Sequence, residues 1–269
     1  MKRFLFVISL TPEKLLSPFR ADLAAISLDS LRQQTSSDWS AVLLGEHNRD
    51  DGDFHYMDLG GVRKEQKLHH FADWLMKQQQ QPEYIIRFDD DDLFHPQALQ
   101  QVSALDFDCY ADRRHWFYDS SSGRCTSQER SWLPNTVIHR TAHAMAAYGK
   151  YHERFPFNDR LPVLLENDHS VAWHAYYKDK NVLSPAEGHP LYLRILSPQS
   201  ITSEANRDYK NYLTKFGDWR ERIPGEYQSC TDRIAESWIR HYGKHRRYFF
   251  SPFRYWRYKL SGAIGKLGN

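Results

Sequence analysis

The sequence lacks several features that mark large classes of protein. It contains only 3 cysteines in 269 residues. Cys109, Cys125 and Cys230 are too widely spaced to form a zinc-binding pattern or an even disulfide framework, so we expect a reducing compartment. No apolar run approaches the ~20 residues that are needed to cross a bilayer.

An excess of charge of one sign is also missing. The formal net charge is +2, which argues against a generic nucleic-acid-binding protein. The opening segment, MKRFLFVISLTPEK, has an apolar run of only about seven residues and no signal-peptide cleavage motif. We therefore expect a β-strand there rather than an export signal, and a cytoplasmic protein.

Aromatic residues are abundant, at 14% of the chain. Such side chains fill a core, stack on ring-shaped ligands or lie at a membrane interface, and composition alone leaves all three roles open.

In the first half of the chain, short apolar segments alternate with amphipathic ones. We expect strands at 3–10, 39–47 and 83–88, with a weaker strand at 54–60. Helices are expected at 20–35, 63–81 and 96–105, and Pro96 should open the last of them. This order predicts an α/β fold, with a mostly parallel sheet and helices on both faces.

The second half is less regular. Residues 113–127 resemble a hairpin around a Ser-Ser-Gly turn, and strands are expected at 135–140 and 189–196. Residues 166–179 resemble a loop that leads into a helix. Ligands of mostly parallel sheets bind beyond the carboxyl ends of the strands, so the residues that follow each predicted strand are the first candidates for a site.

Four consecutive aspartates, Asp89–Asp92, follow the apolar segment YIIRF. A divalent cation relieves the repulsion among carboxylates, and Mg²⁺ and Mn²⁺ prefer oxygen ligands. Because alternate residues of an extended segment point the same way, we expect Asp89 and Asp91 to share a metal site and Asp90 to face elsewhere. Asp92 either joins the metal ligands or fixes the loop. We therefore predict a Mn²⁺ or Mg²⁺ site that binds a diphosphate. The alternative is a solvated acidic turn, with Asp92 capping the helix that begins near Pro96.

A strand, then Asp-x-Asp-Asp, then a proline four residues later resembles glycosyltransferase family 2, which has a GT-A fold. The matching residues are Asp89, Asp91, Asp92 and Pro96, with Ser30, Leu31, Gln34 and Trp39 in a common companion segment. The resemblance implies a GT-A domain over residues 1–203, divided into a nucleotide-binding half (1–105) and an acceptor-binding half (106–203). A C-terminal helical, basic-aromatic extension would follow over 204–269.

The resemblance also implies an activity: a metal-dependent, inverting glycosyltransferase of the hexosyltransferase type. Its donor would be a nucleotide-diphosphate sugar, and its acceptor a polysaccharide, such as lipopolysaccharide, or a lipid-linked saccharide. The segments RFDDDD and LYLRILSPQSITS more loosely resemble rhamnosyltransferases of bacterial surface polysaccharide synthesis. One alternative is a sugar-1-phosphate nucleotidyltransferase, although VISLTPEKLLSPF lacks the Gly-rich phosphate loop of that class. Another is a non-catalytic, membrane-associated binding protein.

The resemblance further implies nucleotide-sugar-binding residues, among them Asp89 and Asp90. Glu46 stands where the family has an acidic residue that contacts the base or ribose, but an exposed loop carboxylate is an equal alternative. Thr11 matches a small polar residue near the base, or else is a helix cap or a turn residue. Arg194 either neutralises the diphosphate or forms a surface salt bridge.

The family places its catalytic base in an adjacent Glu-Asp pair, whereas here Asn167 separates Glu166 from Asp168. We favour Asp168 as the base because it begins a predicted helix, whose backbone donors help to keep it ionised. Glu166 is the alternative base or an acceptor-binding partner, and Asp168 acting only as a helix cap stays open. Trp173 either stacks on a sugar ring or packs in the core. The late metal-contacting histidine of the family has no match, and His189 lies upstream of its place.

Residues 240–260 mix cations with tyrosine, phenylalanine and tryptophan. We favour peripheral contact with an anionic membrane, which would hold the protein at the inner face of the cell membrane. A helix packed on the domain and binding to single-stranded nucleic acid are the alternatives. We expect no nucleic-acid partner.

Overall fold

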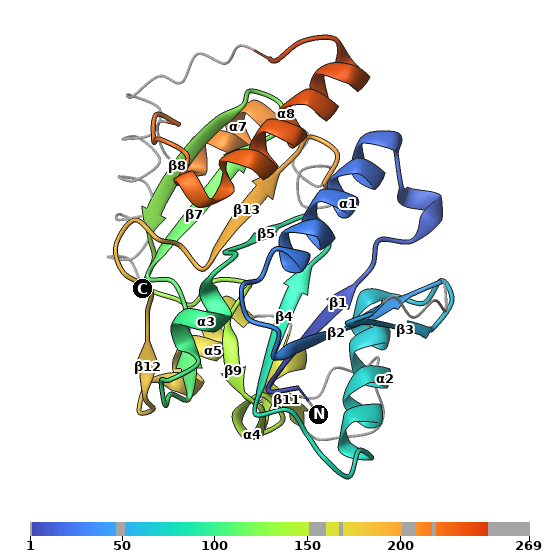
Figure 1. Cartoon of the computed structure of the whole chain (residues 1–269), viewed down its shortest axis with the longest axis vertical. Coiled ribbons are helices and arrows are strands. Elements are labelled where there is room, and N and C mark those ends of the chain that lie inside the picture. The colour runs from blue at the N-terminus through green and yellow to red at the C-terminus, as the bar shows by residue number, and fades with distance from the viewer. Residues whose placement is uncertain are drawn as a thin grey trace.

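The computed structural model describes residues 2–46, 52–150, 160–166, 169–200, 208–216 and 219–246. A seven-stranded sheet has the order β12-β6-β9-β4-β1-β2-β3, a four-stranded sheet the order β5-β13-β7-β8, and β10 pairs with β11 (Figure 1). The strands are β1 (Phe4–Ser9), β2 (Trp39–Gly45), β3 (Phe54–Asp58), β4 (Tyr84–Asp89), β5 (Leu93–Phe94), β6 (Cys109–Tyr110), β7 (Arg114–Asp119), β8 (Arg124–Glu129), β9 (Ile138–Arg140), β10 (Ala147–Lys150), β11 (Arg160–Pro162), β12 (Val182–Leu183) and β13 (Tyr192–Leu196). The helices are α1 (Pro18–Arg32), α2 (Lys64–Met76), α3 (Ala98–Val102), α4 (Thr141–Ala144), α5 (His169–Tyr177), α7 (Tyr209–Leu213) and α8 (Gln228–Tyr242), with 3₁₀ turns η1 (Glu13–Leu15), η2 (Val163–Leu165), η3 (Thr214–Phe216) and η4 (Gly225–Tyr227).

The large sheet is mostly parallel, as predicted. β1 pairs in parallel with both β2 and β4, so that Phe4 lies opposite Trp39 and Tyr84. β3 adds in parallel to β2, and β9 is antiparallel to both of its neighbours. The strands predicted at 3–10, 39–47, 54–60 and 83–88 are confirmed as β1, β2, β3 and β4.

Alternation along β1 determines what covers each face of this sheet. Phe6 and Ile8 belong to one buried cluster with residues of α1 and α3, whereas Leu5 and Val7 belong to a second cluster with the apolar side of α2. Burying one such side chain contributes about 1.5–3 kcal/mol, so a strand with two apolar faces is held strongly between helix layers. The predicted α/β class with helices on both faces is confirmed.

Helix α1 begins where local chemistry favours a start. Ser17 is its N-cap and accepts a hydrogen bond from the Arg20 N–H at 3.3 Å, and Pro18 occupies the first turn. The helix predicted at 96–105 is shorter than expected and does not begin at Pro96, since α3 starts at Ala98. Before α3, the backbone bonds to a segment distant in sequence: the Pro96 carbonyl accepts a hydrogen bond from the Thr35 N–H at 2.9 Å.

The smaller sheet joins distant parts of the chain. The predicted hairpin is confirmed as β7 and β8, and the predicted strand at 189–196 is confirmed as β13. β13 inserts between β5 and β7, a pairing that the sequence did not reveal. Helix α8 lies beside α1 and over this sheet (Figure 1), and its Trp238 packs in one buried cluster with Phe19 and Leu193. Residues 225–242 therefore share a core with the first half of the chain.

Within the described ranges, no helix combines the length and the apolar character that a membrane span requires. The described residues stop at Arg246. Most of the basic-aromatic segment 240–260, and with it the predicted membrane contact, lies outside them.

Candidate functional site

A pocket of about 520 Å³ opens at the carboxyl edge of the large sheet. Its walls come from residues 9–12 after β1, Arg20 of α1, residues 61–65 and Lys67 around the start of α2, residues 89–92 after β4, and residues 194–196 of β13. This is the edge at which mostly parallel sheets bind ligands.

The aspartate quartet forms a tight turn at the floor of this pocket. β4 ends at Asp89, and the Asp92 N–H donates to the Asp89 carbonyl at 3.3 Å. Carboxylate oxygens of Asp89, Asp91 and Asp92 all lie within 4.8 Å of one another. Asp90 turns away and accepts from both the N–H (2.6 Å) and the hydroxyl (3.1 Å) of Thr11. The turn, rather than the extended alternation that we expected, thus separates Asp90 from the other three.

The three converging carboxylates have different partners. Asp89 is paired with the Lys64 ammonium at 2.5 Å, and Asp92 accepts from the Ile195 N–H at 2.9 Å. Among the described residues, Asp91 makes no hydrogen bond or ion pair and lines the pocket. The alternative in which Asp92 caps the next helix is wrong, because its carboxylate is bound to β13 and the residue before α3 is Gln97.

Burial and the neighbouring charges shift the pKa values of these three carboxyl groups in different directions. Burial, followed by the charges of Asp90 and Asp89, raises the pKa of Asp91 to about 7. Burial also raises the pKa of Asp92, and the Asp91 charge adds to this effect. For Asp89, burial acts in the same direction, but the Lys64 and Arg87 cations outweigh it and hold its pKa below the usual value. A divalent ion would offset the repulsion that these shifts express.

These shifts predict a pH dependence of the metal-free protein. A carboxyl whose pKa is raised in the folded state stabilises the fold below its unfolded-state pKa, and this contribution is lost as pH rises toward the folded value. With chelator present, we expect the free energy of unfolding to fall more between about pH 5 and pH 8 in the wild type than in Asp91→Asn. Urea denaturation at each pH measures the difference. Buried histidines titrate with the opposite sign in both proteins, so the comparison isolates Asp91; equal slopes would contradict the prediction.

Several cationic side chains also line the pocket. Arg194 lies in its wall on β13, with its positive charge near Asp92 and Asp89 rather than in a surface salt bridge among the described residues. Arg20 donates to the Thr11 hydroxyl and to the Gln199 carbonyl, both at 3.2 Å. These guanidinium groups suit phosphate oxygens.

Three lysines line the pocket, Lys14, Lys64 and Lys67, and none of them was predicted. Lys64 opens α2, and Lys67, 1% exposed, donates to the Leu10 carbonyl at 3.0 Å. Burial lowers the pKa of Lys67, against the opposing charges of Glu46 and Asp90. The sequence could have indicated Lys64 and Lys67. A helix that follows a parallel strand begins at the carboxyl edge of the sheet, so lysines in its first turn lie near the site.

The predicted residue Glu46 follows β2 at the same edge. Its carboxylate accepts from the Glu13 N–H at 3.2 Å, and it is not among the described residues that line the pocket. Thr11 lines the pocket, where it holds Asp90.

The structure describes only part of the segment that was predicted to carry the catalytic base. Asp168 lies outside the described residues. Glu166 follows η2 and is half-buried, and it is not among the residues that line the pocket. Arg87 of β4 donates to the Leu164 carbonyl at 3.1 Å, which connects η2 to the strand that carries Asp89.

The sugar-stacking interpretation of Trp173 is wrong, since its ring is 0% exposed and its indole N–H donates to the Val163 carbonyl at 2.7 Å.

No protein-family model matches this chain, and no curated protein matches it by sequence at a significant level. Several solved structures share part of its fold. Residues 1–349 of TarS from S. aureus align at 12% identity over 90% of this chain and 72% of that one, with a TM-score of 0.46. A second TarS structure aligns at 14% identity and a TM-score of 0.45 over 91% of this chain, which spans only 44% of that one.

An inositol-1-phosphate CTP transferase from T. maritima aligns at 16% identity over 77% and 94% of the two chains, with a TM-score of 0.42. The glycosyltransferase GlyE of Streptococcus pneumoniae aligns at 10% identity over 91% and 65%, with a TM-score of 0.41. All four are distant likenesses, so any function for this chain has to rest on its own site.

Proposed function

We propose that this chain is a metal-dependent, inverting glycosyltransferase that uses a nucleotide-diphosphate sugar as donor. The observation that carries the proposal is the convergence of three carboxylates on one point of a pocket whose other walls hold cations. Carboxylates suit a divalent ion, and lysine and arginine suit the oxygens of a diphosphate. A pocket of about 520 Å³ at the ligand-binding edge has room for such a donor.

The donor set fits Mn²⁺ or Mg²⁺. All three side chains offer oxygen, the ligand that these hard ions prefer, and Asp91 faces the pocket with no partner among the described residues. Asp89, Asp91 and Asp92 would hold the ion, whose positive charge would offset the negative charge that develops on the departing diphosphate. We propose that Lys64 and Arg194, which both line the pocket, bind the same diphosphate.

The remaining roles follow from the chemistry of inversion. A carboxylate must take the proton of the acceptor hydroxyl as this oxygen attacks the sugar, and we propose Asp168, with Glu166 as the alternative. The link from β4 through Arg87 to η2 places Glu166 on a segment tied to the strand that ends in the aspartates. We propose a polysaccharide or a lipid-linked saccharide as acceptor, used at the inner face of the membrane, and a rhamnosyl group among the candidate sugars.

Replacing Arg194 by glutamine should weaken binding of a nucleoside diphosphate with Mn²⁺ by about 10- to 100-fold, since a hydrogen bond to a charged group contributes about 1.5–3 kcal/mol. Calorimetric titration measures the affinity. Arg222→Gln is the matched control, because Arg222 is exposed and does not line the pocket. Equal affinities of the two variants would remove Arg194 from the proposed site.

The activity itself is tested with Mn²⁺ and a panel of nucleotide sugars. The proposal expects release of a nucleoside diphosphate that requires the metal. Pyrophosphate release from a nucleoside triphosphate and a sugar phosphate would instead indicate a nucleotidyltransferase, which the glycine-free loop after β1 disfavours. No metal-dependent nucleotide binding at all would indicate a non-catalytic binding protein.

A further inference from the structure

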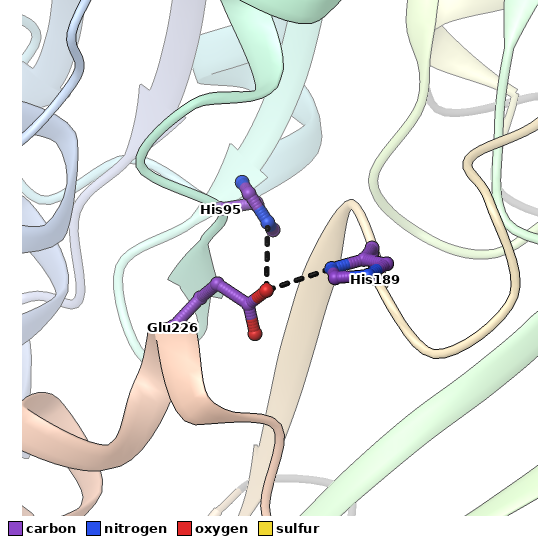
Figure 2. A group of neighbouring side chains, drawn as sticks. All are labelled: His95, His189 and Glu226. Atoms are coloured by element: carbon purple, nitrogen blue, oxygen red, sulfur yellow. Dashed lines mark hydrogen bonds and ion pairs between the residues drawn. The ribbon is translucent and has the colours of Figure 1, made fainter.

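A second group of potential ligands lies outside the donor pocket. His95, His189 and Glu226 point toward one another (Figure 2), and each offers one ligand atom within 4.8 Å of the others. One oxygen of Glu226 lies 2.7 Å from Nδ1 of His189 and 3.8 Å from Nε2 of His95. None of the three residues lines the donor pocket.

His95 gives the independent sign that this group is a site. Its side chain is 1% exposed, yet its Nε2 has no hydrogen-bond partner among the described residues and points toward Glu226 (Figure 2). A buried polar nitrogen without a partner is costly, so its persistence requires an explanation. The rest of the residue is well fixed: Nδ1 of the ring accepts from the Gln97 N–H at 3.1 Å, and the backbone N–H of His95 donates to the Leu191 carbonyl at 2.9 Å.

The three ligands come from separate parts of the chain. His95 follows β5, His189 lies shortly before β13, and Glu226 lies in η4, which leads into α8. β5 and β13 pair with each other, so two of the ligands are set by one ladder of the smaller sheet. An ion bound here would therefore link η4, and α8 that follows it, to the smaller sheet.

We propose that His95, His189 and Glu226 bind a divalent transition-metal ion of the Zn²⁺ class. Two imidazole nitrogens with one carboxylate oxygen form a ligand set that suits Zn²⁺ and not Mg²⁺ or Ca²⁺, which take oxygen ligands. Tetrahedral Zn²⁺ with bonds of about 2.0–2.2 Å places its ligand atoms about 3.4 Å apart, between the two separations seen here. Small side-chain movements suffice, and water completes the coordination.

Binding of the ion also displaces protons from the ligand atoms. The proton between Nδ1 of His189 and Glu226 moves to Nε2 of His189, or to solvent where that nitrogen already carries a proton, and the proton on Nε2 of His95 moves to Nδ1. The Gln97 N–H contact then lengthens, so two hydrogen bonds, this one and the bond between His189 and Glu226, are exchanged for three bonds to the metal. The bound ion links η4, and α8 that follows it, to the smaller sheet. This structural role is independent of the proposed glycosyl transfer.

The test uses the full chain carrying Asp91→Asn, stripped with chelator and then dialysed against Zn²⁺ with excess Mg²⁺. We expect one Zn²⁺ per chain and a higher unfolding temperature, since a ligand that binds the folded state stabilises it. In the same background, His189→Ala and Glu226→Gln should each weaken Zn²⁺ binding by at least about 10-fold. The His189 side chain is 54% exposed, so its loss should leave the fold intact.

His70→Ala is the control, because His70 is an exposed histidine of α2 outside the cluster. It should bind Zn²⁺ as the parent does. The proposal is overturned if the parent binds no Zn²⁺, or if His189→Ala and Glu226→Gln keep the full affinity and the full thermal shift.

Discussion

Asp91→Asn is expected to lower metal-dependent sugar transfer by about 10²- to 10³-fold, because a bound divalent ion contributes several kcal/mol to stabilising a departing diphosphate. Asp91 is the informative choice among the four aspartates. Asp89 is engaged by Lys64, Asp90 by Thr11, and Asp92 by the backbone of β13, so replacing any of these also disturbs structure.

The loss at Asp91 should therefore be functional and not a consequence of unfolding. Its neutral replacement removes repulsion from Asp90 and Asp89, so the metal-free variant should be at least as stable as the wild type at neutral pH. Asp73→Asn, an exposed aspartate on α2, is the matched control and should keep full activity. Activity within threefold of wild type in Asp91→Asn would remove this carboxylate from the metal ligands.

Trp238→Ala is expected to destabilise the fold by about 3–5 kcal/mol, the usual cost of truncating a large buried aromatic side chain. Trp238 is 1% exposed and packs edge-on against Phe19 of α1, with ring centroids 5.2 Å apart. Its ring centroid also lies 4.2 Å from that of Tyr242, the last residue of α8, after which Gly243 ends the helix with a φ of 80°. Removing the indole leaves a cavity between α1 and α8.

Urea denaturation measures this effect, and Ile239→Ala provides the control. Ile239 neighbours Trp238 on the same helix but is 44% exposed, so its truncation should cost far less. Equal losses in the two variants would mean that α8 does not share the core of the domain. Because α1 also carries Arg20 into the donor pocket, Trp238→Ala should weaken nucleotide binding as well.

The fold could be predicted where local pattern decides it. β1, β2 and β4 are short apolar segments whose side chains on both faces can be buried only between two helix layers. The start of α1 is marked by Ser17 and Pro18. The region around α3 was harder, because the Pro96 carbonyl bonds to Thr35, a partner that is near in space and not in sequence.

The candidate site divides in the same way. The aspartate quartet follows one strand, so its placement at the carboxyl edge could be predicted from local sequence. The contact of Asp92 with Ile195 joins residues about a hundred positions apart, and it depends on how β13 enters the smaller sheet. The grouping of His95, His189 and Glu226 has no sequence spacing that reveals it, since it arises only after three segments have packed.

The most direct test of the central claim is a crystal grown with Mn²⁺ and a nucleoside diphosphate, with anomalous diffraction recorded to locate the metal. We predict one manganese peak between the carboxylates of Asp89, Asp91 and Asp92, in contact with the diphosphate, and Lys64 moved from Asp89 toward a phosphate oxygen. Carboxylates without a manganese peak between them, or a nucleotide bound elsewhere on the molecule, would contradict the account.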